Sequence, residues 1–263
     1  MLVQRGNAPM IFDILTIFPD LLDSPLNEAI IRRAKEADQV QIEITNIRDF
    51  ATDKHSMTDD RPFGGGEGMV MKPEPLAAAL ESVKNKNGPG HVVLLSPQGR
   101  QYNQQLVIEL SKQEHLIFIC GRYEGVDKRL IDASVDDEIS IGDYILTGGE
   151  LAAMIIIDSV TRVLPGVLGC ADSAKKDTFS RKLLKHSQYT RPRNFNGVEI
   201  PEILLSGDHA GIEQYRFLES VRRTLERRPD LIAQEYGSFS KAEVKLLKKN
   251  KLFDQIKKLH KGQ

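Results

Sequence analysis

Glycine residues within three polar loops are the part of this sequence best suited to hold a small ligand. The loops lie in HVVLLSPQGR from His91, HLIFICGRYEGVD from His115 and DEISIGDYILTGGE from Asp137, each after an apolar run. Their glycines are Gly99, Gly121, Gly125, Gly142, Gly148 and Gly149. Glycine lets the backbone approach a ligand closely, so that main-chain N–H and C=O groups can bind it. The alternative, that a glycine only makes a turn, is favoured for one loop but not for all three together.

Two common nucleotide-binding motifs are missing from the sequence. It contains no GxxxxGK[ST] loop for a nucleoside triphosphate and no G-x-G-x-x-G between a strand and a helix. A conventional Rossmann site is therefore disfavoured, and the three loops predict a different pocket for a small cofactor.

A largely parallel α/β sheet is the scaffold that the sequence predicts for these loops. Apolar runs of roughly four to eight residues that end in turn signals are typical of buried parallel strands. We expect further strands in MIFDILTIF from Met10 and QIEITNI from Gln41, and helices within residues 19–37, 75–83 and 151–164. Because ligands bind at the carboxyl ends of such strands, we expect the three loops to wall one pocket.

The composition is that of an ordinary globular chain. Charged residues make up 28% and apolar residues 40% of the 263 residues, and no run approaches the roughly 18 apolar residues of a membrane span. The N-terminus has no long apolar segment, so we expect a cytoplasmic protein. The second methionine, Met10, predicts a disordered lead-in at residues 1–9 or else an upstream start. The two cysteines, Cys120 and Cys170, show no zinc or disulfide spacing, and Cys120 is predicted to be a buried thiol.

Basic helices are predicted for the C-terminal part of the chain. One runs from Ile212 to Pro229, and a second spans roughly Lys241 to Leu259. Residues 211–263 contain 13 Lys and Arg against 7 Asp and Glu, a net charge of +6 in a chain whose net charge is −1. This asymmetry suits a polyanion such as RNA, or else a solvated helical face, and composition alone does not separate the two. The small polar residues of 170–190 predict a flexible linker or lid.

Seven motifs in the sequence resemble those of a known enzyme family. They are DDRPFGGGEGMVMKPEPL, LLSPQGR, ICGRYEGVD, SIGDYILTGGELAAM, RVLPGVLG, YTRP and LLSGDHAGI, and the resemblance runs from about Met10 to Pro229. The family is that of the bacterial tRNA (guanine-N1)-methyltransferases, which belong to the trefoil-knotted SPOUT superfamily. The resemblance implies a knotted α/β domain with a mostly parallel sheet flanked by helices at residues 10–169. It further implies a linker or lid at 170–190 and a small, basic helical tRNA-binding domain at 191–263.

S-adenosylmethionine (S-adenosyl-L-methionine) is the cofactor that the resemblance implies, bound by the three loops of the knot. The residues that match the family's cofactor contacts are Leu95, Ser96, Pro97, Gly121, Tyr123, Glu124, Ser140, Ile141, Gly142, Tyr144, Leu146, Gly148 and Gly149. The family is also associated with dependence on Mg²⁺, but no residue spacing here indicates a metal site.

The implied reaction transfers a methyl group to N1 of guanine, which requires a base for the N1 proton and a donor to the charge that develops on O6. The resemblance assigns these roles to Asp177 in AKKDTF and Arg162 in VTRVLPG. Without it, Asp177 would be interpreted as a helix N-cap and Arg162 as a solvent-facing charge. The implied substrate is a tRNA with guanosine at position 37, next to the anticodon. The implied assembly is a homodimer in which Asp177 meets the cofactor pocket of the other chain.

Other interpretations stay open on the sequence alone. Another SPOUT enzyme, acting on a ribose 2′-hydroxyl or a different base, would not need a linker carboxylate such as Asp177. A non-catalytic RNA-binding protein would lose the GRYEG and SIGDYILTGGE loops, which are intact here. An unrelated nucleotide-binding α/β enzyme is the weakest alternative. The glycine-rich stretch at 64–68 suits a substrate contact or a subunit contact equally.

Overall fold

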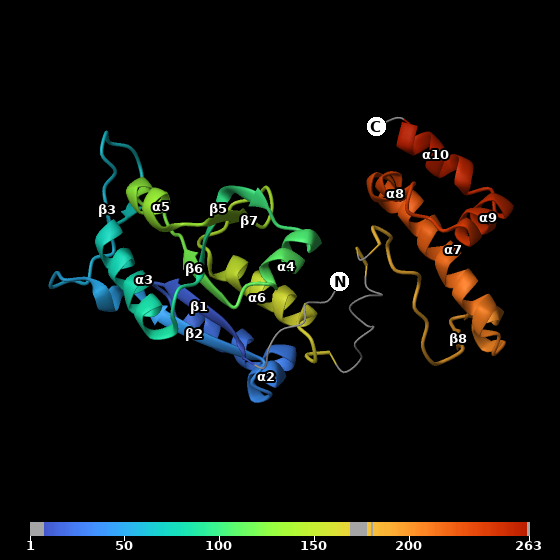
Figure 1. The fold of residues 1–263 in the computed structure, drawn as a ribbon, viewed down its shortest axis with the longest axis horizontal. Helices are drawn as coiled ribbons and strands as arrows, with labels where there is room; N and C mark the ends of the chain where they lie inside the picture. Colours follow the sequence, from blue (N-terminus) through green and yellow to red (C-terminus); the bar gives the residue numbers. More distant parts are fainter. Residues whose placement is uncertain (1–7, 169–177, 180, 262–263) are drawn as a thin grey trace. The chain divides into compact units, whose positions relative to one another are not determined.

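The computed structural model describes residues 8–168, 178–179 and 181–261. The chain divides into two compact units, Met1–Ala171 and Asp172–Gln263, and each is described here by itself. The first unit holds a sheet with helices on both of its faces, and the second is mainly helical (Figure 1). No helix within the described ranges is long and apolar enough to cross a membrane.

The first unit is built on a five-stranded sheet in which every neighbouring pair is parallel. The strands, in the spatial order β2-β1-β6-β5-β7, are β2 (Val40–Asn46), β1 (Met10–Thr16), β6 (His115–Cys120), β5 (His91–Gln101) and β7 (Asp137–Ser140). All six residues of β6 are buried, as expected for a central strand covered on both faces. The predicted α/β class with a mostly parallel sheet is therefore confirmed.

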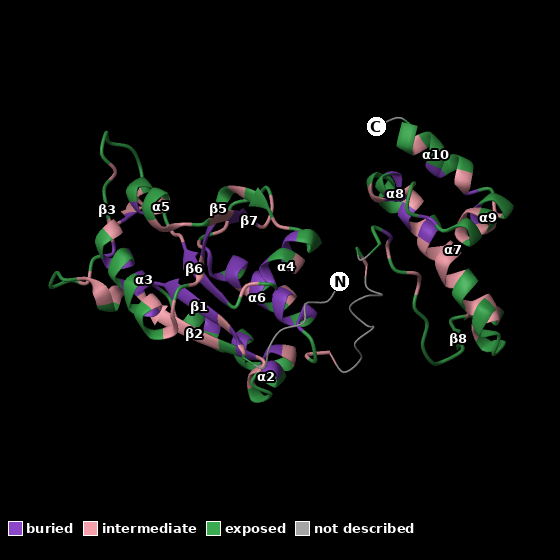
Figure 2. Ribbon diagram, viewed as in Figure 1, coloured by how far each residue is buried: buried purple, intermediate pink, exposed green. Residues whose placement is uncertain are grey.

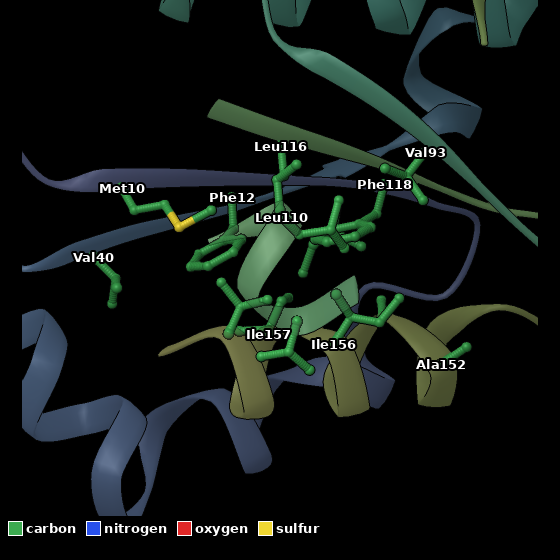
Figure 3. Packing of buried hydrophobic residues seen from close by; sticks show 14 of the residues in the cluster. Met10, Phe12, Val40, Val93, Leu110, Leu116, Phe118, Ala152, Ile156 and Ile157 are labelled. Carbon is green, nitrogen blue, oxygen red and sulfur yellow. The ribbon is translucent and has the colours of Figure 1, made fainter. Parts of the chain in front are cut away.

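Side chains of the central strands alternate between two apolar layers. Phe12 and Phe118 stack with ring centroids 6.3 Å apart in one layer, whereas Ile117 and Ile119 belong to the other. This period of two follows from the pleat of a strand, which turns successive side chains to opposite faces. Ile156 and Ile157 of an apolar helix close the first layer (Figure 3). The sheet is therefore the buried centre of the unit, as the burial colours indicate (Figure 2).

Helices cover both faces of this sheet. The first apolar layer receives residues from α1 (Asp20–Asp23), the 3-10 helix η1 (Pro25–Asn27), α2 (Ala29–Glu36), α4 (Gln104–Leu110) and α6 (Glu150–Val163). The second layer receives residues from the 3-10 helix η2 (Ile47–Phe50), α3 (Pro73–Asn87) and α5 (Lys128–Ser134). The polar stretch after η2 contains only a small antiparallel pair, β3 (Asp59–Asp60) with β4 (Val70–Met71). The helix predicted at 75–83 corresponds to α3, which extends beyond that range at both ends.

The second unit packs four helices around a small apolar cluster. Its elements are the hairpin β8 (Asn194–Phe195) and β9 (Val198–Glu199), the 3-10 helix η4 (Glu202–Leu205), α7 (His209–Arg227), α8 (Pro229–Glu235), α9 (Lys241–Lys249) and α10 (Phe253–Lys261). The buried centre comprises Leu183, Val221, Ile232, Phe239, Leu247, Leu252 and Ile256. Leu183 comes from the predicted linker, so the end of that stretch contributes to the packing of this unit.

The prediction of one helix from Lys241 to Leu259 is wrong, because the structure breaks it into α9 and α10. Lys251 has a φ of 57°, in the left-handed region that ends a helix. The turn places Leu252 in the core at 7% exposure, where its burial favours the break. Pro229 likewise starts a helix, α8, that the sequence analysis did not predict.

Candidate cofactor site

One cavity of about 420 Å³ lies beside the middle of β5 and at the carboxyl ends of β6 and β7. Its size falls within the range of roughly 300–1,000 Å³ that is usual for small-molecule sites. Every residue predicted to contact the cofactor lines it: Leu95, Ser96 and Pro97 at β5, Gly121, Tyr123 and Glu124 after β6, and Ser140, Ile141, Gly142, Tyr144, Leu146, Gly148 and Gly149 after β7. The structure thus brings the three predicted loops together around one space.

The first loop is a bulge within β5. Leu95 and Arg100 both pair with Ile139 of β7, so the four residues between them leave the ladder. The cavity is lined by three residues of this bulge, Ser96, Pro97 and Gln98. A Cβ on Gly99 would lie 2.3 Å from the Glu138 carbonyl carbon, a distance that no side chain tolerates. Glycine at this position is therefore what allows the strand to rejoin the ladder after the bulge.

The second loop follows β6 and turns sharply. Tyr123 adopts a φ of 57° although it is not glycine, and such strained residues gather at functional sites. The N–H of Glu124 donates to the carbonyl of Met69 at 2.9 Å, and the N–H of Met71 donates to the carbonyl of Gly125 at 2.9 Å. These bonds attach the glycine-rich stretch before Met69 to the wall of the cavity.

The third loop leads from β7 into α6 and lies against the second. The N–H of Gly149 donates to the carbonyl of Gly121 at 3.0 Å, and a Cβ at Gly149 would lie 2.8 Å from the Cα of Cys120. Near its start, the N–H of Gly142 donates to the Ser140 hydroxyl at 3.3 Å. The two loops approach each other at backbone distance, which requires glycine at the contact.

Sequence reasoning missed a buried ion pair behind these loops. Arg122 and Glu150 form it, and the hydroxyl of Thr16 donates to Glu150 as well. The signal was present in the sequence as an arginine inside GRYEG and a glutamate at the start of an apolar helix. Neither residue showed its partner, because Arg122 and Glu150 are 28 residues apart and Thr16 lies 134 residues from Glu150.

The two predicted catalytic residues have different outcomes. Arg162 lies exposed in the last turn of α6. It shares one exposed stripe with Leu151, Ile155 and Asp158, since positions i, i+4, i+7 and i+11 fall on one face of a helix. Asp177 lies outside the described residues, as does Cys170, and its catalytic role stays a prediction.

Cys120, Tyr102 and Asp127 are among the groups of the first unit whose pKa values are shifted by burial or by a bonded neighbour. Complete burial raises the pKa of the Cys120 thiol well above its usual value, so this free cysteine stays protonated, as its predicted burial implies. Burial raises the pKa of Tyr102 to about 12, against a smaller opposite effect of its contact with Ser159. Hydrogen bonds from Arg129 lower the pKa of Asp127, the N-cap of α5, to about 2. None of these three groups changes charge near neutral pH, so none suits a general base there.

Metal-binding geometry is absent among the described residues. Within the part of the chain that the structure covers, no group of three or more His, Cys, Asp or Glu side chains could hold an ion. The cavity instead offers main-chain groups, small apolar side chains and few charges, which suits an organic cofactor.

A parallel sheet whose strand ends carry three loops around one cavity defines an α/β protein with a small-cofactor site. Residues 10–234 match the family described as tRNA (Guanine-1)-methyltransferase TrmD. The chain belongs to this family, and the predicted SPOUT class and methyltransferase class are thereby confirmed.

Several curated relatives cover most of the chain, and each is named tRNA (guanine-N(1)-)-methyltransferase. The relative from Dehalococcoides mccartyi is 53% identical over 239 residues, which cover 90% of this chain and 96% of the relative. The relative from Geobacter sp. strain M21 is 51% identical over 248 residues, covering 94% and 99%. The relative from Carboxydothermus hydrogenoformans is 55% identical over 223 residues, covering 85% and 87%.

Proposed function

We propose that this protein transfers a methyl group from S-adenosylmethionine to N1 of guanosine at position 37 of tRNA, in the cytoplasm. The observation that carries the proposal is that every residue matched to the family's cofactor contacts lines one cavity. The names of the relatives support the tRNA substrate and the guanine N1 target.

The residues of the cavity fit the cofactor. Leu95, Ile141 and Leu146 supply apolar surface for a flat base, and the glycines expose main-chain donors and acceptors. Glu124 and Ser140 add polar groups for the amino-acid and ribose parts. When bound, S-adenosylmethionine supplies an electrophilic methyl group carried on a sulfonium. Enclosing these loops in the family's knot would hold their spacing rigid.

Two side chains then perform the proton chemistry. Asp177 accepts the proton of guanine N1, a role worth roughly 10²–10⁴ in rate for a positioned base. Arg162 donates to O6 and stabilises the negative charge that develops there. Its place on an exposed stripe of α6 supports a role toward a group outside its own subunit. The assay includes Mg²⁺, because the family is associated with dependence on this ion, and no residue is assigned to bind it.

A second copy of the chain completes the site. Leu151 and Ile155 are 52% and 45% exposed on the same stripe as Arg162, although the opposite side of α6 is buried in the core. Large apolar side chains in one exposed line are typical of a subunit interface. In the proposed homodimer, this stripe faces the partner, and Asp177 of one chain reaches the cavity of the other.

The second unit, which includes most of the linker predicted at 170–190, binds the tRNA. Residues 211–263 carry a net charge of +6, and Arg222 and Arg227 are exposed on α7. Contacts between such side chains and phosphates release counterions, so the affinity for tRNA falls steeply with salt. Guanosine 37 must leave its stack to be methylated, which costs a few kcal/mol and is cheapest in a loop.

The proposal is tested by incubating the full chain with labelled S-adenosylmethionine and tRNA transcripts that carry guanosine or adenosine at position 37. We expect label in the guanosine transcript alone and its recovery as N1-methylguanosine after nuclease digestion. Equal labelling of both transcripts would overturn the proposal and favour a SPOUT enzyme acting on a ribose or another base. No labelling of either would favour a non-catalytic RNA-binding protein.

A further inference from the structure

A two-point ion pair lies behind the second and third loops of the cavity. Arg122 Nη2 lies 3.0 Å from Glu150 Oε2, and Arg122 Nε donates to Glu150 Oε1 at 3.2 Å. The side chains are only 13% and 2% exposed. The buried hydroxyl of Thr16 donates to the same Oε1 at 2.7 Å. Three donors in a buried setting restrict the orientation of the carboxylate, and loss of Arg122 would leave its charge without compensation.

These three residues come from three different parts of the first unit. Thr16 is the last residue of β1, Arg122 lies in the second loop, and Glu150 is the first residue of α6, where the third loop ends. The backbone of Arg122 also forms an antiparallel bridge with Gly148. The Glu150 carboxylate therefore connects both loops to the sheet, at the point where their backbones meet.

Phe18 and Gly148 also confine the guanidinium group of Arg122. Its Cζ lies 4.4 Å from the ring centroid of Phe18, within cation–π range. A Cβ on Gly148 would lie 2.2 Å from Arg122 Nε and 2.5 Å from Glu150 Oε2, so only glycine leaves room for the pair. Arg122 lines the cavity, yet its Nε and Nη2 both point to Glu150 and away from a ligand role.

We propose that Arg122 and Glu150 are positioning residues, whose ion pair sets the spacing of the second and third loops and thereby the affinity of the cavity for its cofactor. This inference rests on the proposed function, because the cofactor is the one named there. The competing explanation is that Arg122 binds the carboxylate of the cofactor directly, with Glu150 as a minor neighbour.

A double-mutant cycle separates the two explanations. The full-length Arg122→Met, Glu150→Gln and doubly substituted proteins are titrated calorimetrically with S-adenosylhomocysteine. If the pair acts as one unit, each single change weakens binding about tenfold and the double change weakens it about tenfold as well. The KM for S-adenosylmethionine rises in parallel, while kcat at saturation stays within about threefold. Near-normal binding by Glu150→Gln, or additive losses in the double variant, would overturn the proposal.

A second ligand tests the direct-contact explanation independently. 5′-Methylthioadenosine carries the same nucleoside and sulfur but has no amino-acid carboxylate. A positioning role predicts the same fold-loss for both ligands in Arg122→Met, whereas a loss confined to S-adenosylhomocysteine would assign Arg122 to the carboxylate. Gly148→Ala, which crowds the pair without changing its charge, is expected to reproduce the loss for both ligands.

Matched controls keep the result specific. Arg129→Met removes the exposed ion pair in which Arg129 Nη2 lies 2.7 Å from Asp127 Oδ2. We expect this variant to keep its affinities for S-adenosylhomocysteine and 5′-methylthioadenosine within about twofold of wild type. Arg122→Lys keeps the charge without the two-point geometry and serves if Arg122→Met fails to fold, with a loss in both affinities still expected. Wild-type protein that binds neither ligand would overturn the proposed function together with this inference. Wild-type binding with unaffected variants would overturn the positioning role alone.

Discussion

Gly99 lies so close to Glu138 that a Cβ there would be 2.3 Å from the carbonyl carbon of Glu138. The neighbour is backbone in the parallel pair of β5 with β7, so no side chain can rotate away to make room. The bulge that carries Ser96 and Pro97 into the cavity therefore depends on the absence of one methyl group.

Gly99→Ala is expected to lower both stability and cofactor affinity. Forcing a methyl group into the β5–β7 contact costs about 2 kcal/mol, which lowers Tm by about 4–8 °C for a unit of this size. The bulge shifts with it, so the affinity for S-adenosylhomocysteine falls. Thermal unfolding and calorimetry measure the two effects. Gly237→Ala is the control, because no heavy atom lies within 4 Å of its added Cβ, and an equal loss there would contradict the explanation.

Asp177→Asn is expected to abolish turnover while it leaves the affinity for S-adenosylhomocysteine within a few-fold. The amide keeps the shape of the side chain but cannot accept the proton of guanine N1, so a loss of roughly 10²–10⁴ in rate follows. Single-turnover methylation of the guanosine 37 transcript is the measurement. Near-normal single-turnover rates in this variant would remove Asp177 from the proton transfer.

Leu151→Glu is expected to prevent dimer formation and methylation together. Leu151 is 52% exposed, and a carboxylate in place of this apolar side chain would be buried against the partner without a bonding group, at a high cost in free energy. The helix itself tolerates the change, because an acid in the first turn of α6 interacts favourably with the helix dipole. Sedimentation at matched concentrations measures the mass. Val198→Glu, at an exposed position of β9, should leave the mass unchanged, and an unchanged mass for Leu151→Glu would refute the interface.

The stability of the second unit is expected to respond to pH through Glu235 and Glu243, which share Arg181 as a partner. Burial raises the pKa of Glu235 despite the attraction of Arg181. A raised carboxyl pKa means that the folded state binds the proton more tightly, so this contribution to stability is lost as pH rises above about 4.5. Glu235→Gln should therefore gain stability over wild type as the pH increases toward neutral, as thermal unfolding from pH 4 to 8 can measure.

Glu243→Gln provides the control of opposite sign. Burial raises the pKa of Glu243, but hydrogen bonds from Arg181 and Ser240 more than offset it, and the net pKa is lowered. A carboxyl group whose pKa is lowered on folding stabilises the folded state at pH values above its usual pKa. This stabilisation is lost as the pH falls. Glu243→Gln should thus cost stability at neutral pH and less in acid. The same pH trend in both variants would contradict the assigned shifts.

Local sequence patterns were sufficient to predict the five strands of the parallel sheet and the convergence of the loops, but not the short pairs β3–β4 and β8–β9. Apolar runs such as that ending at Cys120 predict buried parallel strands, and parallel strands bring their following loops to one edge. The order of the strands was not predictable, because β6 pairs with β1 and β5 through contacts that leave no local pattern. The Thr16–Glu150 bond was missed for the same reason. The break at Lys251 was missed because apolar residues keep a helical spacing on both sides of it. Only the backbone of Lys251, with its positive φ, leaves the helical conformation.

The bond between Thr16 and Glu150 has a consequence for biosynthesis. The ribosome must add 134 residues after Thr16 before its partner Glu150 exists, which takes on the order of ten seconds at usual rates. For most of that interval β1 and β2 lack β6, the strand that joins them to the rest of the sheet, and their apolar faces have no partner from that strand. Long-range parallel pairing of this kind folds slowly, so the apolar surface of the nascent chain stays exposed for longer than in a protein with local contacts.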